Sequence, residues 1–196
     1  MSRLSGDPTS DPTSVPNKGS ASAPPPAAHV PPGGSTPQQA RDRVLRRWAN
    51  LLGLGGLVPF FGLALVAVVA DPDYARMAVL AQIQYAVTIL SFIGALHWGI
   101  ALAGHGMSAA RTRTALVWSV VPSLYAFFAT IAPELVPEPS IGPAHATLLL
   151  LAIGFVCAWI VDQRIYRGHP VPAWFPRLRG LLTAGATLSV LLTLLG

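Results

Sequence analysis

The chain has 196 residues, of which 52% are hydrophobic and only 11% are charged, and its mean hydropathy is +0.52. Because a soluble domain is typically about one quarter charged, this composition argues against an ordinary soluble protein. The net charge of +5 does not indicate a nucleic-acid partner, because most of the arginines lie near the ends of apolar runs, where they act as topology signals in membrane proteins. The single cysteine, Cys157, can form neither an internal disulfide nor a metal site by itself.

Residues 1–40 form a segment that is rich in proline, serine and alanine and that contains no aromatic residue. Such a segment buries too little apolar surface to offset the entropy lost on ordering it. We therefore predict a disordered N-terminal tail over residues 1–40, followed by one membrane domain over residues 41–196.

Five apolar runs follow the tail, and each is treated as a membrane-spanning helix. About 20 apolar residues cross the hydrocarbon core of a bilayer as an α-helix. The last run is short, but Pro176 is a favourable first helical residue, and a helix that begins there gains a turn. The predicted fold class is therefore all-α, a bundle of five transmembrane helices, with spans at about 48–70, 79–104, 114–133, 143–161 and 176–195.

The arginines predict the orientation of these spans. Only Arg76 lies in the loops on one side, whereas the other side holds Arg41, Arg43, Arg46, Arg47, Arg111, Arg113, Arg164, Arg167, Arg177 and Arg179. Because positive loops stay in the cytoplasm, we predict a cytoplasmic N terminus and a periplasmic C terminus. Tryptophans prefer the membrane interface, and we predict an interfacial belt on the arginine-rich side made of Trp48, Trp98, Trp118, Trp159 and Trp174.

Small residues at helical spacing indicate where helices could approach one another closely. In span two, Ser91, Ala95 and Gly99 recur every four residues, and in span five Gly185 and Ser189 do the same. We predict that these five residues face neighbouring helices.

His97 lies inside a long uncharged run, residues 77–104. It lies about six residues, or roughly 9 Å, from the cytoplasmic end of span two. Asp162 closes span four on the same side, and Arg177 and Arg179 open span five there. We predict that these four residues form a polar cluster, because lipid penalises unpaired polar groups. The alternative is that His97 bonds only a backbone carbonyl or interfacial water. Its protonation state stays open, because burial favours neutral imidazole and a carboxylate favours the charged form.

The sequence predicts no catalytic, cofactor-binding or metal-binding residues. His105 lies about 12 Å from His97 along the helix axis, too far for both to bind one ion, and His145 lies on the opposite side of the membrane. The spans carry none of the familiar hydrolase, metalloprotease or phosphate-binding motifs. An enzyme is therefore the less favoured class, and no cofactor is expected.

Four features of the sequence resemble a known membrane-protein family, domain of unknown function 3429, whose animal members include transmembrane protein 69. The features are LGLGGLVPF at 52–60, YAVTILSFIGALHWG at 85–99, Asp162, and PAWFPRLRGLLT at 172–183. The resemblance covers roughly residues 48–195. It implies an inner-membrane protein of bacterial or mitochondrial type, and it implies no activity, substrate or catalytic residue.

The sequence leaves three hypotheses for the function. The leading one is a structural or assembly role within the bacterial inner membrane, with the lipid bilayer and either another membrane protein or a second copy of the chain as partners. The second is a channel or carrier for a small neutral solute, in which Pro59 and Pro122 act as hinges. The third is a membrane enzyme or sensor centred on His97. A water-filled path beside Ser91 and Ser123 would favour transport, and a solid core would favour the structural role.

Overall fold

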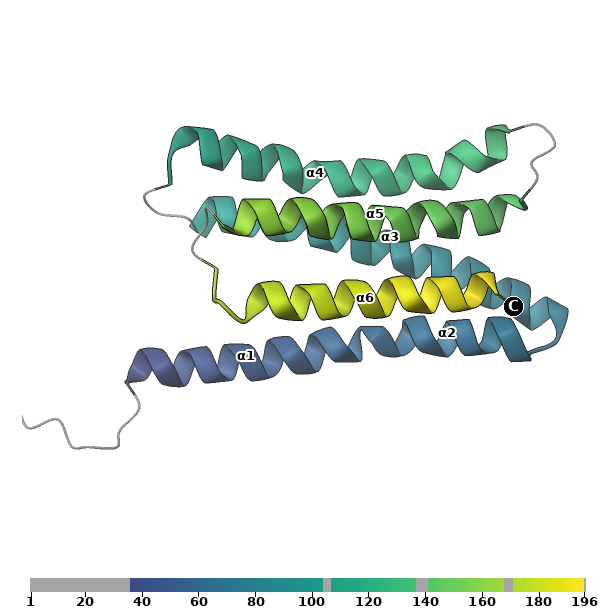
Figure 1. Ribbon diagram of the computed structural model, residues 1–196, viewed down its shortest axis with the longest axis horizontal. Helices are drawn as coiled ribbons and strands as arrows, with labels where there is room; N and C mark the ends of the chain where they lie inside the picture. Colours follow the sequence, from purple (N-terminus) through teal and green to yellow (C-terminus); the bar gives the residue numbers. More distant parts are fainter. Residues whose placement is uncertain (1–35, 104–106, 137–140, 168–170, 196) are drawn as a thin grey trace, which may run out of the picture. The chain divides into compact units, whose positions relative to one another are not determined.

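The computed structural model describes residues 36–103, 107–136, 141–167 and 171–195. These residues are almost entirely helical, which confirms the predicted all-α class. The elements, shown in Figure 1, are α1 (Pro37–Gly55), α2 (Leu57–Val69), α3 (Pro72–Ala103), α4 (Ala109–Ile131), the short 3-10 helix η1 (Ala132–Leu135), α5 (Pro143–Tyr166) and α6 (Phe175–Leu194).

Within the described ranges, five helical segments are long and apolar enough to cross a membrane. They are Pro37–Val69, Pro72–Ala103, Ala109–Leu135, Pro143–Tyr166 and Phe175–Leu194. Each corresponds to one predicted span, so the number and order of the spans are confirmed.

The helices of the first three spans begin earlier than predicted. In span two, α3 begins at Pro72 rather than near residue 79, because a proline in the first turn and the acidic Asp73 both stabilise a helix N terminus. In span three, α4 begins at Ala109 rather than near residue 114, and the Ser108 side chain accepts a hydrogen bond from the backbone N–H of Arg111 there. The first helix begins at Pro37, inside the segment predicted to be a tail. The rest of that prediction, disorder over residues 1–35, falls outside the described residues.

Span one is interrupted at Gly56, which separates α1 from α2. Two features of the sequence explain the break: glycine stabilises a helix poorly, and Pro59 has no N–H to donate to the carbonyl four residues earlier. The hydroxyl of Tyr85 on α3 donates to the Gly56 carbonyl oxygen at 2.9 Å. The break is therefore held against α3 by a specific hydrogen bond.

The centre of the bundle is filled by large apolar side chains. Phe60, Leu90, Leu148, Leu151 and Phe155 come from α2, α3 and α5, and each is at most 1% exposed. The outer surface is also apolar, with exposed leucine, valine and phenylalanine side chains along the helices. A helix bundle with an apolar core and an apolar outer surface is suited to lipid rather than to water.

Glycines set the closest approaches between the helices. A Cβ atom on Gly94 of α3 would overlap the backbone carbonyl oxygen of Ser119 on α4, and one on Gly154 of α5 would overlap the ring of Tyr125. A Cβ on Gly185 of α6 would lie 2.7 Å from Leu57. Glycine at these positions allows the helices to pack at short distance.

The small residues predicted for helix packing divide between two outcomes. On α6, Ser189 is fully buried and Gly185 packs against α2. On α3 the prediction is wrong: Ala95 and Gly99 are exposed, Ser91 is only half-buried, and nothing lies within 4 Å of a Cβ on Gly99. The packed face of α3 carries Gly94 instead.

A group of polar side chains joins α2, α3 and α6 within the membrane. The amide nitrogen of Gln82 donates to Ser189 Oγ at 3.1 Å and to the Phe60 carbonyl oxygen at 3.4 Å. The hydroxyl of Thr193 donates to the Gln82 amide oxygen at 2.7 Å. Because this buried amide uses both its donors and its acceptor, it stabilises the helix contact rather than leaving a polar group unpaired.

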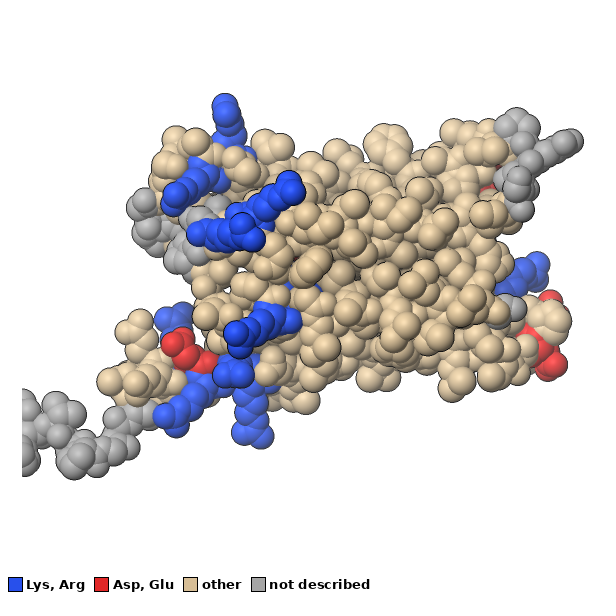
Figure 2. All heavy atoms as spheres, in the orientation of Figure 1, with Lys and Arg blue, Asp and Glu red and all other residues tan. Residues whose placement is uncertain are grey.

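The charged side chains are unequally distributed between the two ends of the bundle. Figure 2 shows basic side chains crowded at the end where α1, α4 and α6 begin, and a surface almost free of charged side chains between the two ends. Among the described residues, the opposite end holds one arginine, Arg76, which lies 3.7 Å from the exposed Asp73. The asymmetry of the loops in the sequence is therefore an asymmetry between the two ends of the folded bundle.

Candidate functional site: a buried polar cluster

The structure brings together three of the four residues predicted to form a polar cluster. His97 of α3 places Nε2 at 3.3 Å from Asp162 Oδ1, and Arg179 of α6 places Nη2 at 3.1 Å from Asp162 Oδ2. His97 and Asp162 are completely buried, and Arg179 is 4% exposed. The carboxylate of α5 therefore lies between a side chain of α3 and a side chain of α6.

Arg177 does not belong to this cluster. It is exposed, whereas Arg179 is buried. Residues two positions apart point to different sides of a helix, so one helix could not direct both guanidinium groups toward Asp162.

Trp118 is a further member of the cluster, which the sequence did not predict. Its indole Nε1 donates to Asp162 Oδ1 at 3.0 Å, which adds α4 to the helices joined at this point. The predicted belt is therefore wrong for Trp118, which lies nine residues, or about 14 Å, inside α4. The sequence gives no signal for this contact, because in the predicted span 114–133 Trp118 lies only four residues from the cytoplasmic end.

The remaining predicted belt residues lie at the arginine-rich end. Trp48 and Trp98 are about half exposed on the outer surface, and Trp159 and Trp174 are half-buried. The belt stays a prediction for these residues, and the indole Nε1 of Trp159 is buried in the bundle.

The cluster is enclosed by further side chains that restrict its movement. The imidazole of His97 stacks on the ring of Tyr166, with centroids 5.5 Å apart and an interplanar angle of 4°. The guanidinium Nη1 of Arg179 donates to Thr183 Oγ1 at 2.6 Å, one turn further along α6. His97 and Arg179 thus each have a defined position, and both are shielded from solvent.

The chemistry of this arrangement favours helix association over catalysis. A carboxylate that contacts a guanidinium, an indole N–H and an imidazole is well compensated for its burial. None of these groups is exposed to a substrate in the aqueous phase, since Asp162 and His97 have no accessible surface. In the part of the chain that the structure describes, no three His, Cys, Asp or Glu side chains are placed to hold a metal ion.

We expect Trp118→Phe to lower the free energy of unfolding by about 1.5–3 kcal/mol, which is the usual contribution of a hydrogen bond to a charged group. The substitution keeps one aromatic ring but removes the N–H that donates to Asp162, together with the second ring of the indole. Trp98→Phe is the matched control, because Trp98 is half exposed and should contribute little. Reversible unfolding in mixed detergent micelles measures both variants, and equal loss in the two would contradict the role given to the Trp118 hydrogen bond.

These features define a multi-pass helical membrane protein whose spans are joined by buried polar contacts. The chain belongs to the family described as "Protein of unknown function (DUF3429)", which matches residues 45–195. This confirms the resemblance noted in the sequence.

A comparison with known proteins supports the same family. Over 142 residues the chain is 31% identical to "Transmembrane protein 69" of Xenopus tropicalis, a match that covers 72% of this chain and 51% of that protein. The chain therefore spans about half the length of the curated relative that it matches. No solved structure matches this chain.

Proposed function

We propose that the chain has a structural or assembly role within the bacterial inner membrane. The observation that carries this proposal is the burial of His97, Asp162 and Arg179 between α3, α5 and α6, with the half-buried Trp118 of α4 bonded to the same carboxylate. The intramembrane ionisable groups in this polar cluster are engaged with one another rather than directed toward a path or a reaction centre, although such groups often mark transport or proton pathways.

Packing between α3 and α4 supports the structural role over a carrier. A solute path beside Ser91 and Ser123 would have to separate these two helices. Instead, Gly94 lies against the Ser119 carbonyl and the Pro122 ring, which brings the two backbones together at that level.

The exposed small residues of α3 support an assembly role. Ala95 and Gly99 lie on the outer surface, where they leave room for a helix of another protein or of a second copy to approach closely.

The proposed orientation has a cytoplasmic N terminus and a periplasmic C terminus. We expect a cysteine introduced at Ser108 or Ala173 to be labelled only from the cytoplasm, and one at Asp73 or Gly142 only from the periplasm, because arginine-rich ends remain inside. Maleimide labelling of intact cells and inverted vesicles, with Cys157→Ser as the background, measures this. Labelling of Gly142→Cys from the cytoplasmic side would show that the orientation is the opposite of the one proposed.

Cross-linking in native membranes tests the assembly role. We expect one partner chain, or a second copy, at a fixed stoichiometry after purification. Gly99→Leu should strongly reduce the amount of cross-linked partner that is recovered, and Leu102→Ala, on the same helix, should not. Recovery of only the single uncrosslinked chain would contradict the assembly role.

A flux measurement separates this role from a carrier. Liposomes that contain the purified chain should swell in glycerol or urea at the rate of protein-free liposomes. Faster swelling would overturn the proposal in favour of a pathway for small neutral solutes.

A further inference from the structure

A basic hollow lies on the outer surface between α5 and α6, at the arginine-rich end of the bundle. Its volume is about 840 Å³, and three exposed arginines line it: Arg164 in the last turn of α5, Arg167 just after that helix, and Arg177 near the start of α6. Among the described residues, no acidic side chain lines the basic hollow or forms a salt bridge with these arginines. The described part of the chain therefore leaves this positive charge without a counter-charge.

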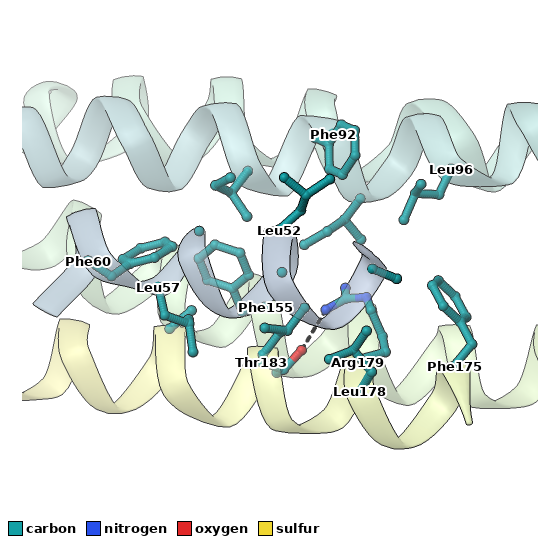
Figure 3. A pocket seen from close by; sticks show the side chains of 17 residues that line it. Leu52, Leu57, Phe60, Phe92, Leu96, Phe155, Phe175, Leu178, Arg179 and Thr183 are labelled. Carbon is teal, nitrogen blue, oxygen red and sulfur yellow. Dashed lines mark hydrogen bonds between the residues drawn. The ribbon is translucent and has the colours of Figure 1, made fainter. Parts of the chain in front are cut away.

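The buried Arg179 is not part of the basic hollow, although it lies on the same helix as Arg177. Figure 3 shows Arg179 in the wall of a separate, apolar cavity, where it donates a hydrogen bond to Thr183. Its Nη2 contacts Asp162, and the side chain is only 4% exposed. Arg179 is thus paired inside the bundle, whereas the arginines of the basic hollow are open to a ligand from outside.

An apolar groove continues from the basic hollow along the same two helices. The groove has a volume of about 330 Å³, and it is contiguous with the basic hollow because Trp159 and Gly180 line both. Beyond these two residues its walls are mainly apolar and include Val156, Ala184, Leu188 and Leu191. From Gly180 to Leu191 the groove follows α6 for about 16.5 Å. This is about half of the ~30 Å hydrocarbon core of a bilayer, which is the depth of one lipid leaflet.

The indole of Trp159 forms the wall where the basic hollow meets the apolar groove. The side chain is half-buried, and a Cβ on Gly180 would lie 3.2 Å from its Nε1, so the ring packs against the backbone of α6. Its Nε1 is buried there and does not face a ligand. The indole therefore supplies apolar surface, and the polar contacts to a ligand come from the exposed arginines.

The order of these surfaces along the membrane normal indicates which ligand fits. Guanidinium groups bind phosphate oxygens through paired, charge-assisted hydrogen bonds, and basic pockets between transmembrane helices suit anionic head groups. A lipid with a phosphate head and an acyl chain has its charge and its apolar part in the same order as the basic hollow and the apolar groove. A zwitterionic head would also bring a cation close to three arginines, which is unfavourable.

We propose that the basic hollow and the apolar groove together bind one anionic phospholipid. Its phosphate contacts Arg164, Arg167 and Arg177, and one acyl chain lies in the groove as far as Leu191. This binding needs no protein partner. It therefore goes beyond the proposed assembly role, and either can fail without the other.

Native mass spectrometry of the full chain in detergent micelles tests the proposal. The chain is titrated with phosphatidylglycerol and, separately, with phosphatidylcholine that has the same acyl chains. We expect one saturable phosphatidylglycerol per chain, bound at a concentration about tenfold lower than phosphatidylcholine, because charge-assisted contacts to an anion are worth that factor or more. Glycerol 3-phosphate, which has the phosphate but no acyl chain, should not displace the lipid.

A matched pair of double variants tests the position of the phosphate. Arg164→Gln combined with Arg167→Gln should weaken phosphatidylglycerol binding at least about tenfold, since each arginine near an anionic lipid contributes to its binding. Arg43→Gln combined with Arg113→Gln removes the same charge from the same end of the bundle. These two arginines are exposed and line neither the basic hollow nor the apolar groove, so this control should bind as the unchanged chain does.

A second matched pair tests the position of the acyl chain. Ala184→Trp places an indole in the apolar groove and should weaken phosphatidylglycerol binding by about tenfold or more, because the blocked volume excludes the acyl chain. Ala81→Trp makes the same substitution at an exposed position of α3, outside the groove, and should leave binding unchanged.

Four results would overturn the proposal. Equal binding of the two lipids would remove the role of the charge, and equal loss in the two arginine pairs would assign the preference to the whole basic end rather than to the hollow. Displacement by glycerol 3-phosphate would assign a soluble phosphate ester. Binding unaffected by Ala184→Trp would exclude the acyl chain from the groove. If an arginine variant does not fold, the lipid comparison and the two tryptophan variants decide the question.

Discussion

Replacing Asp162 by alanine is expected to lower the free energy of unfolding by about 3–5 kcal/mol, the cost of leaving one partner of a buried ion pair without the other. The variant strands the guanidinium of Arg179, which lies 3.1 Å from the carboxylate and is 4% exposed. It also leaves the Trp118 indole N–H without its acceptor. Reversible unfolding in mixed detergent micelles measures the loss.

Two further variants show whether the stranded charge causes this loss. Combining Asp162→Ala with Arg179→Met removes both charges and should recover much of the stability, because an apolar replacement of a whole buried pair is often nearly neutral. Asp73→Ala is the control, since Asp73 belongs to an exposed pair with Arg76 and such pairs contribute little. If the double variant is less stable than Asp162→Ala alone, the charge argument is wrong.

Gly94→Leu is expected to destabilise the bundle by about 3 kcal/mol, at the upper end of the usual cost of overpacking. A Cβ at this position overlaps the Ser119 carbonyl oxygen, which is backbone and cannot rotate away, and it lies 3.3 Å from the Pro122 ring. The two helices would have to separate.

Gly99→Leu provides the matched control for that variant when both are measured on the purified single chain, where the proposed partner contact at Gly99 is absent. It introduces the same side chain on the same helix five residues further along, where nothing lies within 4 Å of a Cβ. Detergent stability of both variants, measured by thermal unfolding, distinguishes the two faces of α3. Similar melting temperatures for the two would show that close packing at Gly94 does not stabilise the bundle.

The contrast between Gly94 and Gly99 also explains what the sequence could not reveal. In a soluble helix, hydrophobic periodicity identifies the buried face. In α3 the core-facing Leu90 and the lipid-facing Phe92 and Leu102 are equally apolar, because lipid resembles the core in polarity. The sequence therefore predicts the position of the helix but not its rotation about its own axis.

The polar cluster is partly predictable for a different reason. His97, Asp162 and Arg179 all lie within two turns of a helix end on the same side of the membrane, so their depths agree and the high cost of unpaired polar groups brings them together. The rotation of α4 has no such constraint, because a tryptophan is equally at home at the interface and inside the bundle. For that reason the sequence alone assigns Trp118 to the belt, although it donates to Asp162.

Gln82 is a third case. Its burial does not follow from the sequence, since an isolated amide in an apolar run could face lipid, a partner or the core. Its acceptors and donor come from Phe60, Ser189 and Thr193, which are distant in sequence. Only the packing of α2 and α6 against α3 brings these groups together.

The central claim is that His97, Asp162 and Arg179 act together to join α3, α5 and α6, and a double-mutant cycle on His97→Ala and Asp162→Ala tests it most directly. Asp162→Ala should lower the free energy of unfolding more than His97→Ala does. The first variant leaves the Arg179 guanidinium without its carboxylate, whereas the second leaves the carboxylate in contact with Arg179 and Trp118. The double variant should cost less than the sum of the two, by about 0.5 kcal/mol or more. As a control, the losses in unfolding free energy caused by His97→Ala and Gln82→Ala should add in the double variant, since these residues lie about 22 Å apart along α3. Strict additivity for His97 and Asp162, within the scatter of that control, would contradict the cluster.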